Sequence, residues 1–177
     1  LDRGLLGVVQ SFHIQEGNIF NWPAASDYFL KKDSSGGGVL IDTGAHTLDM
    51  LLWLFGEMAE VEYRDDSFGG VEADCEIRLQ TESGIRGYVE LSRTRELPTE
   101  LMIEGDRGRM VVAYKPNQLS LEVDGEKFET FTMPTKYPVG PAISIWHLMI
   151  VRQLENWVES LKGGSPSLVG GAEGRRV

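Results

Sequence analysis

The stretch ADCEIRLQTESGIRGYVELS, residues 73–92, indicates most directly how this chain folds. Apolar residues alternate with polar ones over 73–80 and again over 85–92. A period of two is typical of β-strands, and Glu82-Ser83-Gly84 between the two runs supplies turn residues. The stretch therefore predicts two antiparallel strands with one apolar face and one polar face.

The same alternation continues on both sides of this hairpin. It extends over the region 59–133, interrupted by turn residues at 105–108 and 124–125. The opening segment, residues 6–14, also alternates and predicts a further strand. Most of the chain is therefore expected to form one sheet, with neighbouring strands joined by short turns and running antiparallel.

Two segments have helical character instead. Residues 43–55 are largely apolar and are followed by Gly56, a typical helix C-cap residue. Residues 143–161 carry apolar side chains at the i, i+3, i+4, i+7 spacing and are followed by Gly163-Gly164. A short helix is also expected over 28–32. The predicted fold class is α+β: an open, largely antiparallel β-sheet with helices packed on one face.

Length and charge restrict the function. The chain has 177 residues, which suits one domain, and its 17 basic and 27 acidic residues give a formal net charge of −10. Nucleic acids and anionic membrane surfaces are poor partners for such a chain. The single cysteine, Cys75, excludes an intramolecular disulfide and a cysteine-based zinc site. No apolar run approaches the ~20 residues of a membrane span.

The two ends suggest a piece of a longer protein. The chain begins at Leu1 without a methionine, and it stops at Val177 just after residues that resemble the opening of a helix. We therefore expect further domains outside residues 1–177 and a truncated last helix.

Three titratable residues lie on the first long helix. Asp42, His46 and Asp49 are spaced i, i+4 and i+7, so an α-helix places them on one face. The apolar surroundings predict a mostly buried helix with these groups near an interior or a cleft. Three interpretations are open: a structural set with Asp42 as the N-cap, three ligands of a divalent metal, and acid–base chemistry with His46 as general base. The metal interpretation is weak because no other His or Cys motif supports it.

Neither glycine-rich segment predicts a nucleotide site. Gly36-Gly37-Gly38 lacks the Lys-Ser/Thr signature of a phosphate loop, and Gly4-Leu5-Leu6-Gly7 lacks the third glycine and the helix of a dinucleotide fingerprint. Arg93 interrupts the apolar register after Leu91 and suits either a cleft or, more commonly, a solvated surface position. Trp22 suits a pocket wall or the core.

Several motifs together resemble a known family. The segment GGGVLIDTGAHTLD, residues 36–49, is similar to the GGG-x-L-x-D-x-G-x-H-x-x-D segment of the glucose–fructose oxidoreductase / inositol dehydrogenase (Gfo/Idh/MocA) oxidoreductases. The opening strand, the Trp22-Pro23 loop, ELSR at 90–93, IEGDRG at 103–108 and the closing helix with GGSP at 163–166 match in order. The resemblance covers nearly the whole chain.

The resemblance implies that cofactor and substrate are bound mainly by different domains. In that family a C-terminal α/β domain with an open antiparallel sheet follows a Rossmann domain that binds NAD(P). Residues 1–177 correspond to the substrate-binding and oligomerisation domain. The Rossmann domain and its Glu-Lys-Pro motif are absent, so the chain has no cofactor-binding residues of its own and is expected to be inactive alone.

The resemblance also implies roles for individual residues. His46 and Asp42 match the catalytic positions: His46 would take the substrate hydroxyl proton as hydride leaves, and Asp42 would hold the hydroxyl or orient the base. Trp22, Asp49 and Arg93 are expected to bind substrate, and no metal is expected. The full-length protein would be a cytoplasmic NAD(P)-dependent oxidoreductase of sugars, polyols or sugar derivatives, with NAD or NADP as cofactor, and a homo-oligomer through the sheet. The alternative is a non-catalytic assembly or binding module with the same fold.

Overall fold

The computed structural model describes residues 4–21, 23, 25–114, 117–129, 145–167, 170 and 175. These residues form two compact units, Leu1–Thr132 and Met133–Val177. The first unit contains the sheet and the helices that precede β2. The second contains one long helix, α3 (Ile145–Leu161).

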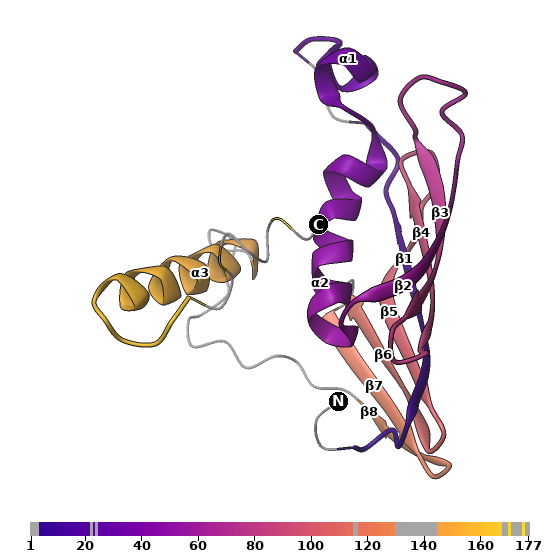
Figure 1. Cartoon of the computed structure of the whole chain (residues 1–177), viewed down its shortest axis with the longest axis vertical. Coiled ribbons are helices and arrows are strands. Elements are labelled where there is room, and N and C mark those ends of the chain that lie inside the picture. The colour runs from indigo at the N-terminus through magenta and orange to yellow at the C-terminus, as the bar shows by residue number, and fades with distance from the viewer. Residues whose placement is uncertain are drawn as a thin grey trace. The chain divides into compact units, whose positions relative to one another are not determined.

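The first unit is built on one sheet of eight strands (Figure 1). In chain order the strands are β1 (Val9–Gly17), β2 (Met58–Asp65), β3 (Asp74–Thr81), β4 (Arg86–Ser92), β5 (Leu97–Gly105), β6 (Gly108–Tyr114), β7 (Asn117–Val123) and β8 (Glu126–Glu129). Their order across the sheet is β2-β3-β4-β1-β5-β6-β7-β8. The sheet is open: β2 and β8 are its two edge strands, and they are not paired with each other.

One strand pair differs from the rest. β1 lies between β4 and β5 and runs parallel to β4, whereas the other paired neighbours are antiparallel. The prediction of an open, largely antiparallel sheet is confirmed. The parallel pair makes β1 and β4 end at the same edge of the sheet, and the chain leaving each strand there is brought together.

The sheet carries its helical layer on one face (Figure 1). A π-helical segment, η2 (Leu40–Gly44), leads directly into α2 (Ala45–Phe55). Within α2 the buried residues Thr47, Leu51 and Phe55 repeat every four positions and so form one stripe toward the sheet. The core beneath them is made by alternate strand residues: Phe12, Ile14, Cys75, Ile77, Leu79, Val89, Leu91, Leu101 and Ile103.

A glycine in β4 makes room for the aromatic part of this core. The rings of Phe12 and Phe55 stack at a centroid distance of 4.4 Å. A Cβ at Gly87 would lie 2.1 Å from Cζ of Phe12. The absence of a side chain at Gly87 therefore lets Phe12 lie flat between β4 and α2.

The helices differ from the prediction in two respects. The helical backbone starts at η2, three residues before the expected Thr43, and the short helix expected over 28–32 is a 3₁₀ turn, η1 (Tyr28–Leu30), followed by α1 (Lys32–Ser35). The expectation of a mostly buried apolar helix holds for the side toward the sheet, where Leu48, Met50 and Leu54 also pack partly buried against the core. The opposite side is open to solvent. Trp53, on α2, is 79% exposed.

Helix α3 and the turn that follows it lie in the second unit. Ile150, Leu154 and Trp157 form an apolar stripe, and each is more than half exposed. The packing of this stripe against the sheet stays a prediction. Among the described residues, no helix combines the length and the hydropathy needed to cross a membrane.

Candidate functional site

The candidate site lies where β1 and β4 end. The segments that follow the two strands stay hydrogen-bonded to each other. The amide of Asn18 donates to the carbonyl of Ser92 (3.0 Å), and the amide of Phe20 donates to the carbonyl of Arg93 (2.8 Å). On its other side, the Arg93 amide donates to the carbonyl of Ala73 (2.9 Å). The backbone of Arg93 is therefore held by hydrogen bonds to the segments on both sides of it.

The side chain of Arg93 reaches η2. Its Nη2 donates to Oδ2 of Asp42, and the side chain is only 10% exposed. Its Nε is buried, and no partner for it is present among the described residues. Arg93 is thus withdrawn from solvent and ion-paired to one of the two predicted catalytic residues, while its placement in a cleft stays a prediction.

Asp42 is the middle residue of the π-helical segment. Its amide donates to the carbonyl of Gly38 (3.1 Å), so Asp42 lies within the helix, and its side chain is 50% exposed. The interpretation of Asp42 as an N-cap is wrong because the helix begins before it. The N-cap positions of η2 and α2 are Val39 and Gly44, which have no capping side chain. Short π-helical segments occur mostly as single turns within α-helices, and they are frequent at functional sites.

The amides at the start of this helix are satisfied from a distance by Glu72, which is 6% exposed. Its Oε1 accepts from the amides of Gly38 (2.7 Å) and Leu40 (3.1 Å). Its carbonyl accepts from the amide of Val39 (3.1 Å). Glu72 could not be predicted from the sequence, since it lies 34 residues from Gly38 and no local pattern connects the two.

His46 and Asp49 follow Asp42 on the same helix. His46, the second residue of α2, is exposed, and Asp49 is half-buried. Among the described residues, none hydrogen-bonds either side chain. The structure therefore brings Asp42 and Arg93 into contact and leaves His46 open one turn further along. Trp22, the remaining predicted site residue, lies outside the described residues.

Carboxylates accept hydrogen bonds from backbone amides in or directly after both glycine-rich segments. Gly38 and Leu40 donate to Glu72, as described above. After Gly7, the amide of Val8 donates to Oδ1 of Asp106 (2.8 Å). A pyrophosphate would need these amides and would be repelled by the carboxylates. Neither segment therefore fits a dinucleotide.

A second polar cluster lies on the sheet face opposite α2. Arg95 donates from Nη1 to Oε1 of Glu90 (2.8 Å) and from Nε to Oδ2 of Asp74 (3.2 Å), and Gln15 donates to Oε2 of Glu90 (2.8 Å). The bond from Gln15 lowers the pKa of Glu90, and Arg95 adds to this against desolvation. Desolvation raises the pKa of Asp74, but bonds from Thr94, Ser92 and Arg95 together leave it lowered. The cluster is internally satisfied, which suits a structural role.

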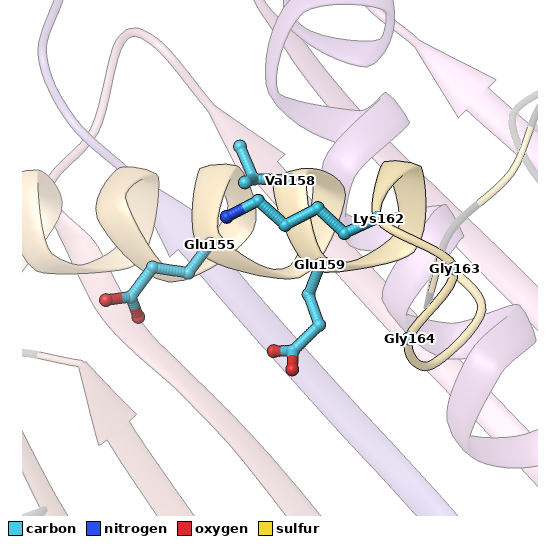
Figure 2. A pocket seen from close by; sticks show the side chains of 6 residues that line it. All are labelled: Glu155, Val158, Glu159, Lys162, Gly163 and Gly164. Atoms are coloured by element: carbon cyan, nitrogen blue, oxygen red, sulfur yellow. The ribbon is translucent and has the colours of Figure 1, made fainter.

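Two further features do not add a site. Within the described part of the chain, no group of three His, Cys, Asp or Glu side chains is placed to hold a metal ion. An open hollow lies at the C-terminal end of α3, lined by Glu155, Val158, Glu159, Lys162 and Gly163-Gly164 (Figure 2). Its walls come from one helix and the turn after it, and they enclose little of any ligand.

The sequence matches, over residues 1–177, the family described as "Oxidoreductase family, C-terminal alpha/beta domain". No curated protein matches it. Among solved structures, levoglucosan dehydrogenase in complex with NADH and levoglucosan superposes with a TM-score of 0.80 at 19% identity, covering 99% of this chain and 55% of that one.

Two other structures give the same picture. Aldose-aldose oxidoreductase from Caulobacter crescentus, complexed with glycerol, has a TM-score of 0.76 at 20% identity, covering 99% of this chain and 52% of its own. An oxidoreductase from Agrobacterium radiobacter, in complex with NAD+, L-tartaric acid and magnesium, has a TM-score of 0.81 at 18% identity, covering 99% and 53%. The chain spans about half the length of these proteins. Sheet, helix order and family match agree, and the chain belongs to the Gfo/Idh/MocA oxidoreductase family, of which it is the C-terminal α/β domain.

Proposed function

We propose that this chain is the substrate-binding half of an NAD(P)-dependent oxidoreductase that acts on a sugar, a polyol or a sugar derivative. The observation that carries the proposal is the ion pair of Arg93 with Asp42 at the edge where β1 and β4 end, with His46 open one helical turn away. Similar structures that contain NADH and levoglucosan, or glycerol, support the class of cofactor and substrate.

The chain's own residues would bind the substrate and move a proton. The imidazole of His46 takes the proton of the substrate hydroxyl as the carbon–oxygen bond becomes a carbonyl. Asp42 accepts a hydrogen bond from the same hydroxyl or from an adjacent one, and Arg93 fixes its carboxylate. Asp49 and Trp22 contribute further contacts to the substrate.

The nicotinamide, when bound, accepts the hydride that leaves the carbinol carbon. Neither glycine-rich segment fits its pyrophosphate, so we place the dinucleotide mainly on another part of the full-length protein. The outer side of η2 and α2 is a suitable docking surface for that part. Ile41 is 58% and Trp53 79% exposed there, on either side of His46. Docking would cover both side chains and exclude water from the reacting centre.

The sheet face opposite α2 is proposed to join two copies of the protein. A row of residues crosses its centre in register: Tyr88 beside His13, His13 beside Met102, and Met102 beside Val111. The rings of His13 and Tyr88 lie 5.0 Å apart. This row is more apolar than a solvated face requires. Phe131, expected from the sequence to belong to the same face, lies outside the described residues.

Turnover by the full-length protein tests the proposal. NAD+ and NADP+ would each be combined with glucose, levoglucosan, myo-inositol and glycerol as probes while the fluorescence of the reduced cofactor is followed. Reduction that requires one of these probes and is lost in His46→Ala supports the proposal. Binding of a probe without reduction of either cofactor, by a protein that does bind NADH, would favour a non-catalytic binding module instead.

A further inference from the structure

Glu72 is a buried carboxylate that has no part in the proposed reaction. It precedes β3, and its side chain accepts hydrogen bonds from amides at the start of η2. The first amides of a helix have no partner within the helix and need acceptors from elsewhere. One residue here supplies acceptors to three consecutive amides, those of Gly38, Val39 and Leu40.

The fit between Glu72 and the glycine turn is close. A Cβ on Gly38 would lie 1.8 Å from the backbone oxygen of Glu72 and 2.8 Å from its carbonyl carbon. No residue other than glycine can therefore occupy position 38 without moving the helix start away from Glu72. The negative charge of Glu72 also lies at the positive end of the helix dipole, which favours this arrangement.

The helix start that Glu72 holds is the one that carries Asp42. Asp42 lies two residues after Leu40, and its own amide donates back to the carbonyl of Gly38. A π-helical turn is rare and occurs mostly as a single turn within an α-helix, so we look to external contacts for what fixes its geometry here. Arg93 provides one such contact at Asp42, and Glu72 provides the other at the first turn.

We infer that Glu72 is a positioning residue. By accepting hydrogen bonds from the amides of Gly38 and Leu40, it fixes the π-helical turn so that Asp42 faces Arg93 and His46 lies one helical turn after Asp42. The inference rests on the proposed function for its catalytic consequence. Its structural part, the dependence of the Asp42–Arg93 contact on Glu72, stands independently.

The structural part is tested by amide hydrogen exchange on the full-length protein. Glu72→Met keeps the length of the side chain but removes the acceptor oxygen, whereas Glu72→Gln keeps one. We expect exchange in residues 38–44 to become about tenfold faster in Glu72→Met, the effect of losing a hydrogen bond to a charged group, and to return toward the wild-type rate in Glu72→Gln. Glu60→Met, at an exposed glutamate of β2, is the control and should leave this segment unchanged. Unchanged exchange over 38–44 in Glu72→Met would overturn the inference.

The catalytic part is tested with the probe substrate that shows turnover. Glu72→Met should lower kcat by roughly ten- to a hundredfold, as expected when a reacting group is misplaced, while the KM for the nicotinamide cofactor stays the same and Glu72→Gln restores most of the rate. Loss of protection over 38–44 with full kcat would contradict a positioning role. His46→Ala, measured in parallel, separates the two proposals, since full activity in that variant would overturn the proposed function and leave the exchange result on Glu72 intact.

Discussion

Nη2 of Arg93 donates to Oδ2 of Asp42, across 51 residues of sequence, and joins the end of β4 to the π-helical turn on the face above it. The arginine is nearly buried, whereas half of the carboxylate side chain is exposed. The contact therefore fixes one side of Asp42 and leaves the other side available to a ligand.

Replacing Arg93 should impair activity more than folding. Arg93→Lys keeps the charge but loses the planar guanidinium, and we expect kcat/KM of the full-length protein to fall by roughly ten- to a hundredfold. Arg78→Lys is the matched control, since Arg78 is 63% exposed on β3. Equal kinetics in the two variants would show that the contact with Asp42 has no part in the reaction.

Gly87 should be intolerant of even a methyl group. In Gly87→Ala the new Cβ would meet the ring of Phe12, which cannot retreat because Phe55 stacks on its other side. We expect a loss of about 1–3 kcal/mol in the free energy of unfolding, measured by urea titration. Combining Gly87→Ala with Phe12→Leu should cost less than the sum of the two single changes. Simple additivity would mean that this clash does not limit the packing.

Acid should destabilise the fold partly through Glu90. Its pKa in the folded chain lies below the ordinary value of 4.5, chiefly because Gln15 donates to it and also because of Arg95. As the pH falls past 4.5, the unfolded chain takes up a proton at this position before the folded chain does, so unfolding becomes more favourable. The stabilisation that Glu90 contributes is fully present above pH 4.5 and is lost as the pH falls through its lowered pKa in the folded chain.

The Glu90 effect can be isolated by urea unfolding between about pH 6 and pH 3. Gln15→Met removes the main donor to Glu90 and should flatten the fall in the free energy of unfolding over this range. A slope equal to that of the wild type would assign acid sensitivity to other carboxylates.

Cys75 should be chemically silent in the folded chain. It is 2% exposed, and burial, together with nearby carboxylates led by Glu72, raises the pKa of its thiol to about 12. Because the thiolate is the reactive form, Ellman's reagent at about pH 8 should react at least about a thousandfold more slowly with the native chain than with the chain in guanidinium. Rapid labelling of native protein would show that β3 opens readily.

The central strands were predictable because β3 and β4 bury one face against the core and leave the other face polar, as the alternation at 73–80 and 85–92 indicates. The placement of β1 beside β4 was not. It is a pairing between Ser11–Gly17 and Arg86–Ser92, and nothing local to either segment specifies a parallel partner so far along the chain. This pairing creates the edge at which Arg93 is held.

The residues of the candidate site were predictable from the sequence, but the backbone geometry and the hydrogen bonds that hold them were not. The spacing of Asp42 and His46 and the register break at Arg93 were visible in the sequence. The π-helical start was not, since Asp42 before an apolar run resembles a capping residue. Glu72 has the same limitation, because its hydrogen bonds depend on the folded path of the chain between β2 and β3. The roles of the site residues stay predictions.

The most direct test of the central claim is the rate of hydride transfer in the His46→Ala variant of the full-length protein. If His46 is the general base, kcat/KM for the active probe should fall by roughly 10²–10⁴. The affinity for NADH and the midpoint of thermal unfolding should stay at their wild-type values, because the exposed imidazole lies off the buried stripe of α2 and we place the dinucleotide mainly on another part of the full-length protein. A His46→Ala variant with wild-type kcat/KM on that probe would contradict the account and leave residues 36–49 with a structural role only.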